Sequence, residues 1–265
     1  MLSYFIWHSH IYWHGIHCYA TLFCLGLLLG ACVVWWGFRQ HQLPQTTYNT
    51  LVPISLIGII LGARLVHCLF YEWDYYVHHL LAILLPFSHE NGTVQFVGYH
   101  GLASHGATLG LMLAVLLFSK QKKISWLLLF DLFAIATPLA GCFIRIGNFF
   151  NSEILGTASA LPWAIIFADV DPLPRHPVQL YEAIAYALIF LVNIVIWRRH
   201  RAGDGLFLGL NLTLVCVVRL ALECIKEEQA DFAPPLLTMG QWLTLPFLLF
   251  GLVMLLYATK RKESR

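Results

Sequence analysis

The chain has 265 residues, of which 59% are hydrophobic and only 11% are charged. A soluble domain carries about 25% charged residues, so the composition excludes an ordinary soluble protein and indicates a chain surrounded by lipid. The net charge of +2 is too small to indicate a nucleic-acid partner. The seven cysteines form no C-x-x-C pair, which argues against disulfides and a zinc site.

Long apolar runs predict an all-α integral membrane protein with about seven transmembrane helices. About 20 residues are needed to cross a hydrocarbon core of about 30 Å. In chain order, the predicted spans are 16–38, 49–70, 102–119, 125–147, 177–197, 206–224 and 238–257. The N-terminus lacks the pattern of a cleavable signal peptide, so we expect the first run to stay in the membrane. Residues 1–265 are therefore predicted to form a single polytopic membrane domain.

Two connections between the predicted spans are long. Residues 71–98 are rich in aromatic residues and histidine, and their apolar stretch 80–85 is too short to span. This pattern predicts an interfacial arm that lies along the lipid headgroups. Residues 148–176 are polar and contain three prolines, which predicts a small extracytoplasmic cap.

The distribution of lysine and arginine predicts that the N-terminus lies outside and the C-terminus inside. Cytoplasmic loops carry an excess of basic residues. With this orientation, 11 of the 16 basic residues fall at inner ends and loops: Arg39, Lys120, Lys122, Lys123, Arg198, Arg199, Arg201, Lys260, Arg261, Lys262 and Arg265.

The other five basic residues fall in the outer half of the predicted bilayer: Arg64, Arg145, Arg175, Arg219 and Lys226. At 1.5 Å per residue, Arg64, Arg219 and His105 lie roughly 20 Å above the inner face. Arg145 lies near the outer end of its span. Charged groups at membrane depth are costly and normally face a partner or a polar cavity, so this outer-leaflet layer is a candidate site.

More than one interpretation of this layer is open. Arg219 and Glu223 are four residues apart and can form a buried ion pair that only fixes helix packing. Arg145 can extend toward the interface. The few carboxylates nearby instead favour an anionic ligand, and a lipid phosphate matches the fork of a guanidinium. His105, among small residues, is either a packing histidine or a general base.

Two segments concentrate polar chemistry. Residues 145–156, the signature segment, read Arg-Ile-Gly-Asn-Phe-Phe-Asn-Ser-Glu-Ile-Leu-Gly. Residues 176–182 read His-Pro-Val-Gln-Leu-Tyr-Glu and open a predicted span, where Pro177 suits the first helical turn. On residue types alone, the second segment is either a binding cluster or a helix start with an interfacial aromatic.

These segments resemble the prolipoprotein diacylglyceryl transferase family. The family pattern Gly-Arg-x-Gly-Asn-Phe-x-Asn-x-Glu-x-x-Gly matches from Arg145 to Gly156, and His-Pro-x-Gln-Leu-Tyr-Glu matches throughout 176–182. The family's His-Gly, Arg-x-x-x-Glu, Ser-Met-Gly-Gln and Gly-Gly-Arg motifs resemble residues 105–106, 219–223, 238–241 and 62–64. The motifs occur in family order over nearly the whole chain.

The resemblance implies transfer of diacylglycerol from phosphatidylglycerol to the lipobox cysteine of a prolipoprotein. The implied catalytic residues are His105 as base, Arg145 and Arg219 as phosphate holders, and Glu223. The implied substrate-binding residues are Arg145, Asn148, Asn151, Glu153, Gly156, Arg64, His14, His176, Gln179, Tyr181 and Glu182. No metal or cofactor is required. We expect a monomer in the bacterial inner membrane, with its active site toward the outer leaflet and with membrane lipid as surroundings.

Four positions depart from the family pattern: Ile144 for the leading glycine, His14 for a tyrosine, Ala107 for a glycine and Val215 for a tyrosine. The departures leave a paralogue with another acceptor or donor, or a non-catalytic lipid- or prolipoprotein-binding member, as alternatives. An anion transporter predicts inverted repeats or broken helices, and the sequence shows no clear sign of either. A metal enzyme using the N-terminal histidines lacks a motif such as H-E-x-x-H.

Overall fold

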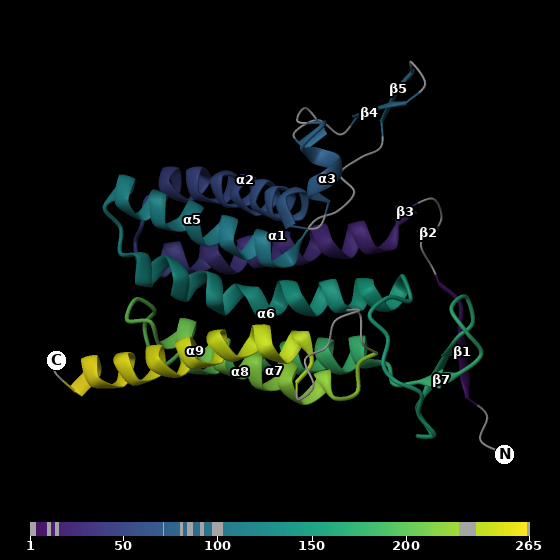
Figure 1. Cartoon of the computed structure of the whole chain (residues 1–265). Helices are drawn as coiled ribbons and strands as arrows, with labels where there is room; N and C mark the ends of the chain where they lie inside the picture. The colour runs from purple at the N-terminus through teal and green to yellow at the C-terminus, as the bar shows by residue number, and fades with distance from the viewer. Residues whose placement is uncertain are drawn as a thin grey trace. The chain divides into compact units, whose positions relative to one another are not determined.

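A computed structural model describes residues 4–9, 12–13, 16–70, 72–79, 82–83, 87–90, 93–96, 103–227 and 237–263. The chain forms two compact units. The first comprises residues 1–39 and 127–265, and the second comprises residues 40–126. Figure 1 shows the helices and strands of both units.

Six helices are long and apolar enough to cross a membrane, by the residues that the structure describes. They are α1 (Cys18–Gln40), α2 (Gln45–Phe70), α6 (Trp126–Phe150), α7 (Val178–Trp197), α8 (Leu206–Glu223) and α9 (Met239–Glu263). Each coincides with a predicted span, so the prediction of an all-α membrane protein is confirmed. A further helix, α5 (Ser104–Lys122), covers the remaining predicted span but has polar residues at both ends. The count of seven spans and the orientation stay predictions.

Helices of the first unit pack closely where one of them carries glycine. A Cβ atom on Gly26 of α1 would lie 3.0 Å from the backbone oxygen of Ala140 in α6. A Cβ atom on Gly209 of α8 would lie 2.7 Å from the backbone nitrogen of Leu255 in α9. Close backbone approach through small residues is a typical way for membrane helices to associate. These contacts bring together the helices that carry the site described below.

The start of α8 is held by a carboxylate from another helix. Asp131 of α6 is fully buried. It accepts hydrogen bonds from the backbone N–H groups of Gly203 (2.7 Å), Gly205 (3.0 Å) and Leu208 (2.9 Å). The N-cap residue Gly205 has no side chain to satisfy these groups. Asp131 therefore acts as an N-cap supplied by α6, which is favourable at the positive end of a helix.

The predicted cap contains a small sheet that includes the N-terminal residues. Strand β6 (Ile165–Phe167) pairs in parallel with β1 (Phe5–Trp7) and antiparallel with β7 (Pro174–Arg175). Phe149, Leu155, Ile165 and Phe167 form a buried cluster behind this sheet, against which Trp7 packs. These strands were not predicted from the sequence, and neither was the short antiparallel pair β2 (Tyr12–Trp13) and β3 (Ile16–His17). Strand β1 and the cap strands therefore lie at the same end of the first unit (Figure 1).

Arg175, one of the five outer basic residues, is fully engaged within this cap. Its guanidinium forms an ion pair with Asp171, another at 3.1 Å with Glu227, and donates to the backbone oxygen of Gly156 at 3.0 Å. The hydrogen bond from Arg175 lowers the pKa of Asp171 below its ordinary value. Arg175 therefore stabilises the cap and is not available to a ligand.

The second unit is built on the crossing of α2 and α5. Gly58 and Gly62 of α2 face Gly106 and Gly110 of α5, and a Cβ atom on Gly62 would lie 2.8 Å from the Cα atom of Gly110. Helix α3 (Trp73–Tyr76) and the hairpin of β4 (Phe87–Glu90) and β5 (Thr93–Phe96) form the predicted arm. Its place along the headgroups stays a prediction.

Candidate functional site

The signature segment joins the last turns of α6 to the cap by a chain of side-chain hydrogen bonds. Arg145 donates from Nη1 to Oδ1 of Asn148 at 3.1 Å. Asn148, which is buried, donates from Nδ2 to Oε1 of Glu153 at 2.7 Å. Asn151 also donates to Oε1 of Glu153, at 3.5 Å. Three of the predicted binding residues are thus ordered around one carboxylate, because α6 ends between them.

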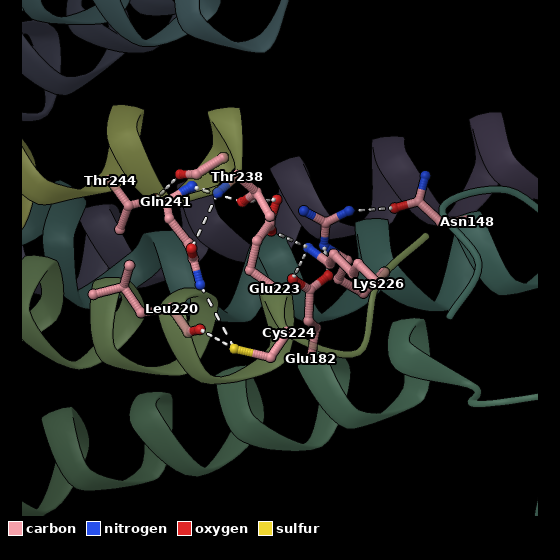
Figure 2. Close-up of polar contacts among 11 residues, drawn as sticks. Asn148, Glu182, Leu220, Glu223, Cys224, Lys226, Thr238, Gln241 and Thr244 are labelled. Carbon is pink, nitrogen blue, oxygen red and sulfur yellow. Dashed lines mark hydrogen bonds and ion pairs between the residues drawn. The ribbon is translucent and has the colours of Figure 1, made fainter. Parts of the chain in front are cut away.

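Glu182 of α7 lies between two cations. Its side chain is 0% exposed, its Oε2 atom lies 2.6 Å from Nε of Arg145, and its Oε1 atom lies 2.7 Å from Nζ of Lys226. Figure 2 shows Glu182 and Lys226 pointing toward each other beside the labelled Asn148. A buried carboxylate needs such partners, because an unpaired charge in a low-dielectric interior is strongly unfavourable. Glu182, predicted as a binding residue, therefore positions Arg145.

Lys226 extends this chain to α8 and α9. Its Nζ atom lies 3.6 Å from Oε2 of Glu223, and Oε1 of Glu223 accepts a hydrogen bond from Thr238 at 3.3 Å. Thr238 also caps the start of α9 by accepting from the N–H group of Gln241 at 3.2 Å (Figure 2). The Glu223 carboxylate lies directly against Gly240, where any larger residue would collide with it. We call Arg145, Glu182, Lys226 and Glu223 the ion-pair chain.

The structure changes the charge balance inferred from the sequence. The alternative in which Glu223 pairs with Arg219 is not seen in the described part of the chain, where Glu223 contacts Lys226 and Thr238 instead. Arg145 is paired with Glu182, and Lys226 is paired with Glu182 and Glu223. Among the cations of this region, Arg219 is the one for which the described residues supply no carboxylate partner. It lies near Tyr186, whose buried side chain feels the charges of Arg145, Arg219 and Glu182.

Backbone hydrogen bonds lock the end of the signature segment between two other segments. On one side, the N–H group of Gly156 donates to the oxygen of His176 at 3.2 Å. On the other side, the N–H group of Thr157 donates to the backbone oxygen of Ile225 at 2.9 Å, and Gly156 forms an isolated antiparallel β-bridge with Lys226. A Cβ atom on Gly156 would lie 2.5 Å from the oxygen of His176, so only glycine fits here. This packing places Lys226 beside the predicted site.

The second predicted segment, at the start of α7, has a dual role. Gln179 is fully buried and donates from Nε2 to the backbone oxygen of Glu153 at 2.7 Å, which ties α7 to the signature segment. Tyr181 accepts a hydrogen bond from Nε1 of Trp163 at 2.8 Å and lies 3.5 Å from Nδ1 of His176. Gln179 is therefore structural, whereas the phenol of Tyr181 and the imidazole of His176 form a polar cluster at the cap.

Two predicted site residues belong to the second unit, where each has a defined setting. Arg64 is buried, donates to the backbone oxygens of Ala82 (2.6 Å) and Ile83 (3.1 Å), and stacks on Tyr76 at 4.8 Å. Arg64 thus holds the arm. His105 is exposed, in the first turn of α5. The predicted site residue His14 lies outside the described residues, while Ala107 and Val215 lie within α5 and α8.

Lys226 was not predicted as a site residue, although it is one of the five basic residues of the predicted outer half. The signal was present, because Lys226 follows Glu223 by three residues and Arg219 by seven, which are helical spacings. The structure also shows Tyr19, at the start of α1, against the signature segment.

The arrangement is suited to holding an anion next to an apolar chain. Two guanidiniums and one ammonium lie near the C-terminal ends of α6 and α8, and two carboxylates, Glu182 and Glu223, hold two of these cations in place. Guanidinium groups bind phosphate through parallel hydrogen bonds. No group of three or more histidine, cysteine, aspartate or glutamate side chains is placed to hold a metal ion within the described ranges.

Comparison with known proteins gives matches over nearly the whole chain. The family model described as "Prolipoprotein diacylglyceryl transferase" matches residues 8–257. A phosphatidylglycerol–prolipoprotein diacylglyceryl transferase of Bacteroides fragilis is 39% identical over 255 residues, which cover 95% of this chain and 92% of the relative. Relatives of the same name from Tolumonas auensis (41% over 253 residues; 94% and 93%) and Chloroherpeton thalassium (38% over 254 residues; 94% and 90%) are similar over comparable lengths.

Proposed function

The chain belongs to the prolipoprotein diacylglyceryl transferase family, and from this premise we propose that it transfers a diacylglyceryl group from phosphatidylglycerol to a prolipoprotein. It is then a multi-pass membrane transferase. Its relatives are named for this donor and this acceptor. The six apolar helices suit a donor that is itself a membrane lipid.

The reaction replaces a carbon–oxygen bond by a carbon–sulfur bond. The acceptor thiol loses its proton to a base, and the thiolate attacks the carbon of the diacylglycerol that carries the phosphate ester oxygen. The carbon–oxygen bond breaks, its electron pair leaves with the oxygen, and glycerol phosphate departs while a thioether forms. Charge increases on the phosphate as this bond breaks, so the cations that face it lower the barrier.

The observation that supports the proposal most directly is the unequal pairing of the cations. Arg145 is fixed by Glu182 and Asn148, and Lys226 is fixed by Glu182 and Glu223. Arg219 has no carboxylate partner in the part of the chain that the structure describes. A phosphate monoester or diester supplies the missing negative charge, with Arg219 and the remaining N–H groups of Arg145 as donors.

The finer features of the proposal follow from the sequence. The acceptor is the lipobox cysteine of the prolipoprotein, and the chain works as a monomer in the inner membrane with its site toward the outer leaflet. Asn148, Glu153 and Glu223 orient the glycerol of the donor. His105 is proposed as the base that accepts the thiol proton, because a neutral imidazole nitrogen can accept a proton and this side chain is exposed. His176 and Tyr181 contact the substrate at the cap.

A mass-shift assay tests the proposed reaction. Purified protein is incubated with phosphatidylglycerol and a lipobox peptide, and the thioether-linked diacylglyceryl peptide is sought by mass spectrometry. The expected product appears with the unaltered chain and is absent for Arg145→Ala and His105→Gln. Arg199→Ala, an exposed position after α7, is the matched control and should retain transfer.

The outcomes separate the parts of the proposal. No product with the unaltered chain, although it binds both substrates, would refute the proposed activity and favour a non-catalytic binding protein. Normal transfer by Arg145→Ala or His105→Gln would refute the role of that residue and leave the activity in place.

A further inference from the structure

Tyr19, in the first turn of α1, packs against the signature segment. A Cβ atom on Gly147 would lie only 2.9 Å from Cδ2 of the Tyr19 ring and 3.5 Å from its Cα atom. On its other side the ring stacks on Phe23, with 6.1 Å between centroids and 25° between planes. The ring is therefore fixed between α6 and its own helix, and Gly147 provides the space that it occupies.

The phenol of Tyr19 lies among the charges of the candidate site. It is close enough to Glu153 and Arg145, the two ends of the hydrogen-bonded chain through Asn148, for both to act on it electrostatically. Its hydroxyl has no hydrogen-bond partner within the described ranges. A phenol can donate one hydrogen bond and accept others, and a polar group that stays unpaired next to lipid costs free energy. A half-buried Tyr19 is thus placed to bond a ligand.

Arg145 alone offers a phosphate only part of its donor set. Its Nε atom faces Glu182 at 2.6 Å, and its Nη1 atom donates to Asn148 at 3.1 Å. A guanidinium has five N–H donors, and Tyr186 is also within hydrogen-bonding reach of Arg145, so only part of this donor set is left for a ligand. A phosphate with several acceptor oxygens needs further donors, and a hydroxyl beside Arg145 supplies one.

We propose that Tyr19 contacts the donor lipid directly, with its phenol O–H donating a hydrogen bond to a phosphate oxygen of phosphatidylglycerol that Arg145 also holds. The inference rests on the proposed function for the identity of the lipid. It adds a residue of α1 to the site residues that the first unit contributes from α6 to α9. Tyr19 is then a donor-binding residue that acts mainly on affinity.

The test compares Tyr19→Phe with the unaltered chain. The substitution keeps the ring that packs on Gly147 and removes only the hydroxyl. Binding of short-chain phosphatidylglycerol to the purified protein in detergent is measured by calorimetry, and KM and kcat are measured in the transfer assay. Loss of a hydrogen bond to a charged group is expected to weaken donor binding about tenfold and to raise KM similarly, with a smaller change in kcat. Tyr257→Phe, an exposed tyrosine in α9, is the matched control and should bind the donor normally.

A second variant separates hydrogen bonding from packing. Gly147→Ala places a methyl group where the Tyr19 ring lies, so it should also weaken donor binding. If it acts by moving the phenol, its effect should largely disappear in the Tyr19→Phe background. Additive losses, or normal binding by Tyr19→Phe, would overturn the inference. Donor binding without any transfer by the unaltered chain would refute the proposed function alone, and the binding comparison would still decide the role of Tyr19.

Discussion

Lys226 offers the sharpest test of the ion-pair chain, and Lys226→Met is the perturbation. Methionine keeps the apolar stem and removes the ammonium, whose side chain is only 10% exposed. The substitution leaves Glu182, which is 0% exposed, with Arg145 as its remaining cation among the described residues. It also removes the cation that faces Glu223.

The size of the effect follows from the two distances. At 2.7 Å and 3.6 Å, unit charges attract each other by about 6 and about 5 kcal/mol at an effective dielectric constant near 20. Desolvation of the ammonium offsets much of this sum, and removing one partner of a buried pair typically costs about 3–5 kcal/mol. Because Arg145 still neutralises Glu182, we expect a loss of about 3 kcal/mol in the free energy of unfolding.

The activity should fall for a related reason. Without Lys226, Glu223 is free to pair with Arg219, four residues earlier on α8, and the proposed phosphate then competes with a carboxylate. Transfer should decrease by about tenfold or more, equivalent to about 1.4 kcal/mol in the barrier.

The assay is unfolding in detergent with increasing sodium dodecyl sulfate, together with the transfer assay on the same preparations. Lys226→Arg, which keeps a cation at the same position, serves as the control. It should lose much less stability and much less transfer activity than Lys226→Met. A Lys226→Met variant as stable and as active as the unaltered chain would show that the ion-pair chain is not needed, and would refute the charge argument.

Three further predictions concern the scaffold. Gly110→Leu forces a side chain into the backbone of Gly58 at the α2–α5 crossing and should destabilise the second unit by about 3 kcal/mol or more in the same unfolding titration; unchanged stability would contradict the close approach. Asp131→Ala removes three hydrogen bonds from the start of α8 and should cost about 3–5 kcal/mol, whereas a normal unfolding curve would exclude the capping role. The pKa of Asp171 is lowered by Arg175, so their pairing stabilises the cap above the ordinary carboxyl pKa, and this stabilisation is lost as the pH falls through the folded-state pKa. Protease cleavage of the cap should therefore increase below about pH 4. Arg175→Gln should abolish this pH dependence.

The transmembrane helices could be predicted because their signal is local. A run of apolar residues is sufficient to place α1 or α7 to within a few residues, since lipid demands length and hydrophobicity but no particular partner. The exception, α5, shows the limit of this signal, because His105 and the lysines near its other end reduce its apolar character. Its helical structure was predicted, but its crossing of the membrane rests on the sequence alone.

The members of the candidate site could be predicted, but their pairing could not. The spacing of Arg219 and Glu223 correctly places both on one helical face, yet the Glu223 carboxylate turns to Lys226 and Thr238. The partner of Arg145 comes from α7, and which carboxylate reaches it depends on the rotation of two packed helices. The apolar pattern of a helix shows which residues share a face, but it does not determine how two helices are rotated against each other.

The strands of the cap were missed because their pairing is not local. β1 and β6 have three residues each, which is too short for a recognisable alternation. In the sequence they are separated by the long helices α1, α2, α5 and α6 and by the elements between them. β6 contributes Ile165 and Phe167 to the buried cluster with Phe149, and Trp7 of β1 packs against that cluster.

The pairing of β1 with β6 also has a consequence for biosynthesis. The partner of Phe5–Trp7 is made about 160 residues later. At synthesis rates of about 5–20 residues per second, the first strand waits about 8–30 s before its partner exists. During that interval it stays without its partner strand, while the helices that precede the cap are made. The sheet of the cap can therefore form only after α6 has been made, and a bulky tag fused before Phe5 would interfere with this pairing.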